Sequence, residues 1–104
     1  MEINFKEGTP FRELKPITYE AIFVCAQVFN KKQLPLVITA TTDGEHMENS
    51  FHYTGEAFDI RIRRLTVVEQ ISIFNQITRE LQQLSRCFQT VLEEDHIHVE
   101  FDWR

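Results

Sequence analysis

The stretch SFHYTGEAFDIR, Ser50 to Arg61, sets a histidine, a glycine and an aspartate among aromatic and aliphatic residues. Its second half alternates between apolar and polar residues. A period of two predicts a β-strand that turns its apolar residues to the core and Asp59 to the opposite face. Gly55 can adopt the backbone angles of a tight bend, so the residues before it can fold back towards that strand and bring His52 near Asp59.

The flanking sequence predicts two principal helices and further strands. Apolar residues at helical spacing begin at Ile17 and stop before Pro35, and a second helical pattern opens with the capping-box pair Thr66 and Glu69. Strands are expected over residues 36–42, 56–62, 87–92 and 96–103, and residues 1–15 show no period and are expected to form an irregular arm. We therefore predict one α+β domain over residues 1–104, with a mainly antiparallel sheet and helices on one side.

Composition narrows the functional classes. The chain has 104 residues, 42% of them hydrophobic, and a net charge of -5, which argues against a nucleic-acid binder. It lacks an apolar run long enough to span a membrane, and its first residues do not resemble a secretory signal. We expect a monomer made in the cytoplasm that needs another route to act outside. Cys25 and Cys87 are expected to be buried free thiols, with a single disulfide as the alternative.

The four histidines fall into two clusters, His46 with His52 and His96 with His98. If the strands over 56–62 and 96–103 are neighbours, His52, Asp59 and His98 can meet at one point. Two imidazoles and a carboxylate, with a fourth position left for water, form a catalytic zinc set. A single histidine on the polar face of a strand is otherwise an exposed residue, and His46 and His96 taken alone have that interpretation.

The segment SFHYTGEAFD resembles the S-x-H-x-x-G-x-A-x-D signature of the zinc D-Ala-D-Ala metallopeptidases. Relatives of that family include phage L-alanyl-D-glutamate endopeptidases and the hedgehog signalling domain. The matching residues are Ser50, His52, Gly55, Ala57 and Asp59. The later segment DHIHVE resembles the second family motif through Asp95, His98 and Glu100. The resemblance covers residues 36–103 and is strongest to small phage-type members, so it implies a hedgehog/DD-peptidase fold.

The resemblance also implies roles. His52, Asp59 and His98 would bind Zn²⁺, and Asp95 would be the general base that takes a proton from the activated water. The substrate would be a peptidoglycan stem peptide, cleaved at a D-Ala-D-Ala or an L-Ala-D-Glu type bond. A second frame stays open, because Glu93 precedes His96 by the same spacing and would make these two the base and the ligand.

Several residues are candidates for supporting roles. Ser50 and Glu100 are expected to hold a ligand imidazole in the required tautomer. Many family members carry an arginine after the first core strand, where this chain reads TTDGEH. The donor that would stabilise the substrate oxyanion is therefore unassigned, with His46 and Arg61 as candidates. This departure motivates an alternative function, a zinc-binding structural or interaction module without catalysis.

Overall fold

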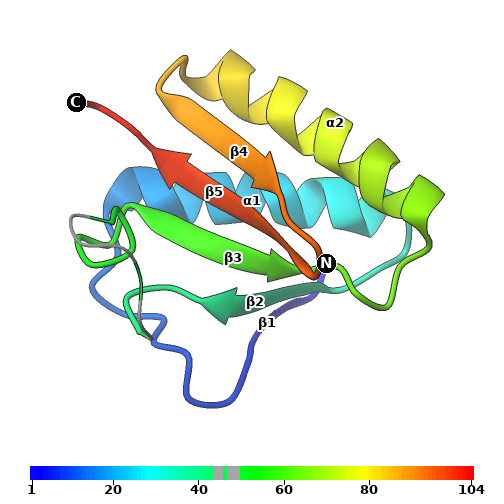
Figure 1. The fold of residues 1–104 in the computed structure, drawn as a ribbon, viewed down its shortest axis with the longest axis horizontal. Helices are drawn as coiled ribbons and strands as arrows, with labels where there is room; N and C mark the ends of the chain where they lie inside the picture. Colours follow the sequence, from blue (N-terminus) through cyan, green and yellow to red (C-terminus); the bar gives the residue numbers. More distant parts are fainter. Residues whose placement is uncertain (44–45, 47–49) are drawn as a thin grey trace.

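The computed structural model describes residues 1–43, 46 and 50–104, which fold as an α+β domain (Figure 1). Five strands form one sheet in the order β1-β2-β3-β5-β4, accompanied by two helices. In chain order the elements are β1 (Ile3–Phe5), α1 (Pro16–Lys31), β2 (Leu36–Ala40), β3 (Ala57–Arg61), α2 (Val67–Leu84), β4 (Phe88–Leu92) and β5 (His96–Phe101).

The first strand corrects the expectation of an irregular arm over residues 1–15. β1 pairs in parallel with β2, with Ile3 opposite Leu36 and Phe5 opposite Ile38. Three residues are too few to show a period of two, so this strand depends on the free edge that β2 offers to it. The sheet is consequently mixed: β1 and β2 are parallel, whereas the other three neighbouring pairs are antiparallel.

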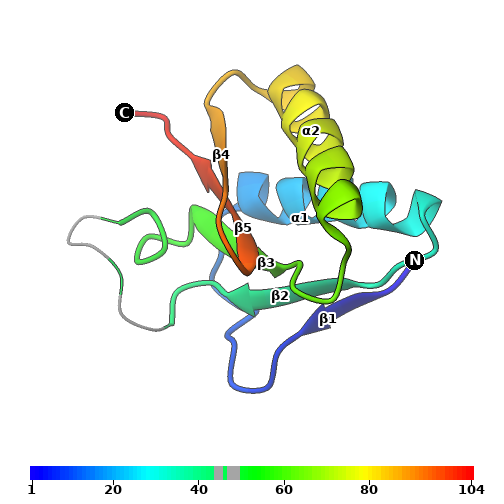
Figure 2. The ribbon, with the colours of Figure 1, turned by 45° about the vertical axis from the view of Figure 1, so that its right-hand side comes forward.

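Both helices pack against one face of the sheet and leave the other face open, as the two views in Figures 1 and 2 show. The helix-facing residues of the central strands are buried, among them Phe58 and Ile60 of β3 and Val99 of β5. α2 begins at the predicted capping box, in which the Thr66 side chain accepts from the backbone of Glu69. The core therefore lies between the sheet and the helices. Both cysteines are free, as expected, but only Cys25 is buried, whereas Cys87 is partly exposed.

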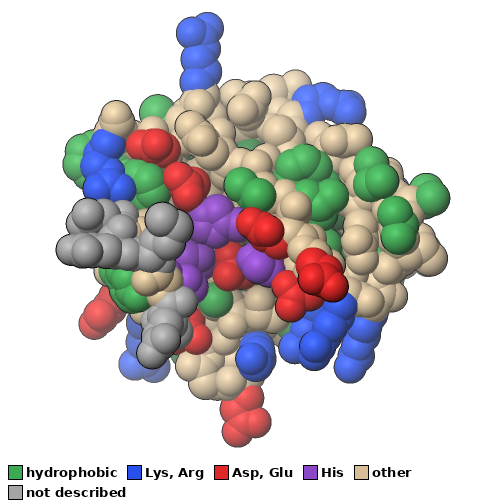
Figure 3. Space-filling model, in the orientation of Figure 1, with side chains coloured by type: hydrophobic (Ala, Val, Ile, Leu, Met, Phe, Trp, Pro, Cys, Tyr) green, Lys and Arg blue, Asp and Glu red, His purple; other side chains and the backbone are tan. Residues whose placement is uncertain are grey.

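The open face carries the polar residues of the two central strands. β3 and β5 are antiparallel neighbours in a register that sets Asp59 opposite His98 and Arg61 opposite His96. Because alternate residues of a strand share a face, this register gathers the polar side chains of both strands. Figure 3 shows the histidines together at the middle of this face, with carboxylates around them. In the part of the chain that the structure describes, neither helix has the length and hydropathy needed to cross a membrane.

Candidate metal centre

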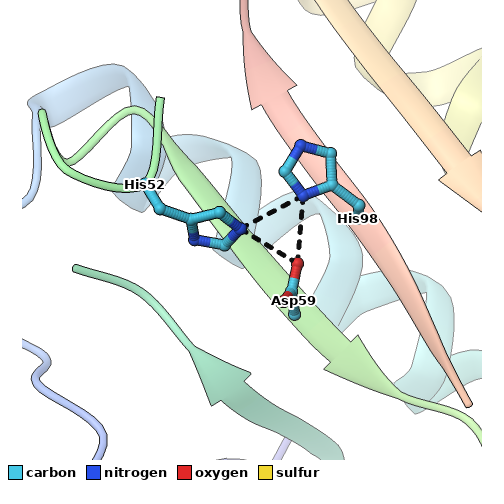
Figure 4. Close-up of side chains that lie close together, drawn as sticks. All are labelled: His52, Asp59 and His98. Atoms are coloured by element: carbon cyan, nitrogen blue, oxygen red, sulfur yellow. Dashed lines mark hydrogen bonds and ion pairs between the residues drawn. The ribbon is translucent and has the colours of Figure 1, made fainter. Parts of the chain in front are cut away.

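Three side chains from separate segments converge on the open face. The Nε2 atom of His52 lies 3.2 Å from Asp59 Oδ1 and 3.2 Å from His98 Nδ1. His98 Nδ1 is 3.0 Å from the same carboxylate oxygen. Figure 4 shows His52 reaching in from the turn before β3, Asp59 rising from β3 and His98 from β5. These three atoms form a group that could hold a metal ion.

The turn that carries His52 is clamped against the start of α1. Gly55 has a positive φ of 75°, and its carbonyl accepts from the Thr18 hydroxyl at 2.7 Å and from the Lys15 amide at 3.0 Å. A Cβ atom on Gly55 would lie 2.9 Å from the Glu13 carbonyl oxygen. Glycine is therefore required at this position on two grounds, the backbone angle and the close approach of the chain. The clamp holds His52 beside the strand that bears Asp59.

The hydrogen-bond partners of the two imidazoles determine their tautomers. His52 Nδ1 lies 2.6 Å from the carbonyl oxygen of Thr41, which can only accept. Nδ1 therefore carries the hydrogen, and Nε2 presents a lone pair in the neutral ring. His98 Nε2 lies 2.7 Å from Glu100 Oε1, so by the same reasoning its Nδ1 atom presents a lone pair. Both free ring nitrogens point at Asp59 Oδ1.

With both imidazoles neutral, three lone pairs meet without a hydrogen between them. Such an arrangement requires a positive charge at its centre, either a metal ion or an added proton on one ring. Zinc in a tetrahedral site binds nitrogen and oxygen at about 2.0–2.2 Å, which separates its ligand atoms by roughly 3.3–3.6 Å. The observed separations of 3.0–3.2 Å approach that spacing. The donor set and its dimensions are thus compatible with a bound metal ion.

The pKa values of Asp59 and His98 shift in the directions expected for a group that is stabilised by an added positive charge. Burial on its own raises the pKa of Asp59. Once a ring of the group takes up the added proton it can donate to Asp59, and hydrogen bonds of this kind from His52 and His98 outweigh burial and hold that pKa well below its usual range. Burial on its own lowers the pKa of His98, but its hydrogen bonds to Asp59 and Glu100 outweigh it and raise that pKa above the ordinary value. Without a metal, these shifts favour an ionised Asp59 and a protonated His98.

Asp95 and His96 lie beside this group and outside it. Asp95 Oδ1 is 2.7 Å from His96 Nδ1, and the Asp95 side chain is 66% exposed. His96 Nε2 is 3.9 Å from Asp59 Oδ2, a longer separation than any within the three-atom set. The geometry thus brings His98 into the candidate centre in preference to His96. It pairs Asp95 with His96 and not with the ligand atoms.

The other predicted residues surround the centre in different ways. His46 stacks on the ring of His52, with centroids 3.8 Å apart and planes 7° apart. Glu100 holds the His98 tautomer as expected. Ser50 Oγ instead accepts from the backbone N–H of His52 at 3.2 Å, so it supports the turn and not the ring. The His52 tautomer is held by the carbonyl of Thr41, which sequence reasoning missed because a backbone carbonyl is common to every residue type.

Arg61 lies two residues from Asp59 on the same strand and lines a neighbouring pocket of about 270 Å³. Asp59, Asp95 and His96 line this pocket as well. The candidate centre therefore opens onto a space where a bound molecule would meet its residues. Within TTDGEH, Gly44 and Glu45 lie outside the described residues.

Neither models of known protein families nor the sequences of curated proteins match this chain. The resemblance to the metallopeptidases accordingly remains a prediction that rests on the motif residues. The geometry of the candidate metal centre is independent of that resemblance, since it follows from the positions and hydrogen bonds of the side chains.

Proposed function

We propose that this protein is a zinc-dependent peptidase that hydrolyses peptidoglycan stem peptides and has a hedgehog/DD-peptidase-like fold. The observation that carries the proposal is the convergence of three lone pairs from His52, Asp59 and His98 without a hydrogen between them. The residues that form this group are the ones to which the motif resemblance assigns zinc binding. Chemistry and sequence pattern thus lead to the same three residues by separate arguments.

A zinc ion held there would lower the pKa of a coordinated water to about 7 and polarise the scissile carbonyl. The chain supplies the rest. Asp59 contributes the one formal negative charge of the set, and Thr41 and Glu100 fix the two imidazoles so that neither rotates away. Asp95 is the proposed base, which accepts a proton from water at its carboxylate and passes it to the leaving amine.

The conformation of Asp95 places a condition on this mechanism. Its hydrogen bond to His96 is the main reason that the pKa of Asp95 lies below its ordinary value, and a depressed pKa makes a carboxylate a poorer proton acceptor. Asp95 must therefore leave His96 and turn towards the candidate metal centre when the substrate enters. Its side chain is exposed and can rotate without disturbing the core.

The same observation supports a second candidate, a zinc-binding structural or interaction module without catalysis. In that case Asp95 keeps its partnership with His96, and the lack of an arginine in TTDGEH has no consequence for rate. A zinc ion would then link the turn before β3 to β5, which stabilises the fold through segments far apart in sequence.

Zinc content and wall hydrolysis, measured on one preparation, test the proposal. We expect one zinc per chain and the release of stem-peptide fragments, identified by mass spectrometry of digested peptidoglycan. His98→Ala serves as the matched control and should lose both properties. Bound zinc without cleavage of several wall chemotypes would favour the non-catalytic module. A chain that binds no zinc would overturn both candidates.

A further inference from the structure

The pocket beside the metal centre is lined by basic side chains from three places in the chain. Arg61 comes from the open face of β3, two residues beyond Asp59. Lys6 follows β1 and is placed by a hydrogen bond of 2.8 Å from its amide to the Ile38 carbonyl. Arg63 follows β3 and completes the lining. In Figure 3 basic side chains lie below the histidines on this face.

These cations have few local partners. Among the described residues, the side chains of Lys6, Arg61 and Arg63 form no hydrogen bond or ion pair. Of the two carboxylates that line the pocket, Asp59 faces the imidazoles of the candidate centre, and Asp95 is bonded to His96 and also held ionised by the charge of Arg63. Three positive charges therefore surround a space in which both carboxylates already have partners. In a chain with a net charge of -5, this is a local excess of positive charge.

Like charges held around one pocket repel each other, and an anion placed among them relieves that repulsion. Arginine is suited to a carboxylate because its planar guanidinium can donate two parallel hydrogen bonds. The pocket of about 270 Å³ falls just below the range of about 300–1,000 Å³ that is typical of drug-sized ligands. A single small residue with its carboxylate is the kind of group that matches both its size and its charge.

We infer that this pocket binds a carboxylate of the substrate peptide, with Arg61 and Arg63 as specificity-determining residues. The inference rests on the proposed function for the identity of the peptide, although the recognition of an anion rests on the pocket alone. The carboxylate has two possible sources. It is either the terminal carboxylate of the last residue, which a carboxypeptidase would recognise, or the carboxylate of an acidic side chain within a peptide.

The test measures binding of three probes to the zinc-loaded protein by calorimetry. The first probe is N-acetyl-D-alanyl-D-alanine, the second is its C-terminal amide, and the third is an amide-terminated peptide whose single carboxylate is a glutamate side chain. One charge-assisted hydrogen bond corresponds to roughly 10-fold or more in affinity. We expect the first or the third probe to bind at least about 10-fold more tightly than the neutral amide, and the tighter one identifies the source of the carboxylate.

Two double variants separate a specific subsite from overall charge. Arg61→Gln with Arg63→Gln should abolish the preference for the acid, while zinc stoichiometry stays unchanged. Arg79→Gln with Arg86→Gln removes the same amount of charge at two positions that do not line the pocket, one within α2 and one two residues beyond its end. This variant should keep the preference for the acid. Equal affinity for acids and amide, no binding of either acid at millimolar concentration, or equal losses in both double variants would overturn the inference.

Hydrolysis of the same probes distinguishes this inference from the proposed function. A preference for acids without hydrolysis would support the subsite and contradict the peptidase. Hydrolysis of acid and amide with equal KM would support the peptidase and contradict the subsite.

Discussion

Zinc should stabilise this protein strongly, since its three ligands come from the turn before β3, from β3 and from β5. An ion that binds only the folded state at a free concentration 100 times its Kd adds about 2.7 kcal/mol to the free energy of unfolding. For a domain of about 100 residues, each kcal/mol shifts Tm by about 4–8 °C. For this chain of 104 residues we therefore expect a rise in Tm of roughly 10–20 °C when zinc is added to the metal-free protein.

A pair of histidine variants makes this prediction specific. His98→Ala removes the Nδ1 atom that lies 3.0 Å from Asp59 Oδ1, so the variant should lose most of the zinc-induced rise. His96→Ala is the matched control, because His96 belongs to the same strand and the same face but approaches Asp59 only to 3.9 Å. This variant should retain most of the rise.

The assay is thermal unfolding followed by circular dichroism, with and without zinc, after treatment with a chelator. Metal stoichiometry is measured on the same samples by mass spectrometry. Identical melting curves for the metal-free and zinc-loaded wild-type protein would refute the three-ligand site. Loss of the zinc effect in His96→Ala, with retention in His98→Ala, would refute the tautomer argument and move the ligand role to the competing motif.

The remaining predictions concern pH, the proposed base and the turn before β3. The zinc-induced rise should shrink as pH falls through the raised pKa of His98, because the proton competes with the metal; a constant rise from about pH 7.5 to about pH 4.5 would contradict this. In the metal-free protein the sign is opposite: the raised pKa of His98 contributes stability that is full below the unfolded pKa of about 6.5 and is lost as pH rises through the folded pKa, which pH-dependent unfolding would detect. Asp95→Asn should keep zinc while hydrolysis falls roughly 100-fold, and Glu93→Gln should keep both; the reverse result would make Glu93 the base. Gly55→Ala should lower the free energy of unfolding by roughly 3 kcal/mol or more, whereas Gly8→Ala, with a similar φ of 85° and no atom within 4 Å of the added Cβ, should cost about 1–2 kcal/mol in urea unfolding; equal losses would contradict the steric argument.

Features that depend on local pattern can be predicted from the sequence. Alternation around Asp59 predicts a strand with one polar face, and the Thr66–Glu69 capping box marks the start of α2. The residue types and the order of the motifs are sufficient to identify His52, Asp59 and His98 as candidate ligands. Such features are readable because each depends on side chains a few positions apart.

Features that depend on long-range pairing become visible only in the folded protein. β1 forms because β2 offers a free edge, and three residues carry no period that would reveal it. Alternation along the strand puts His96 and His98 on the same face, so it does not show which of them lies beside Asp59. The register of β3 and β5 does, because it sets His98 opposite Asp59. The Thr41 carbonyl orients His52 across eleven residues, and a carbonyl has no signature in the sequence. Lys6 likewise joins Arg61 and Arg63 at the pocket only because the sheet places β1 one strand away from β3.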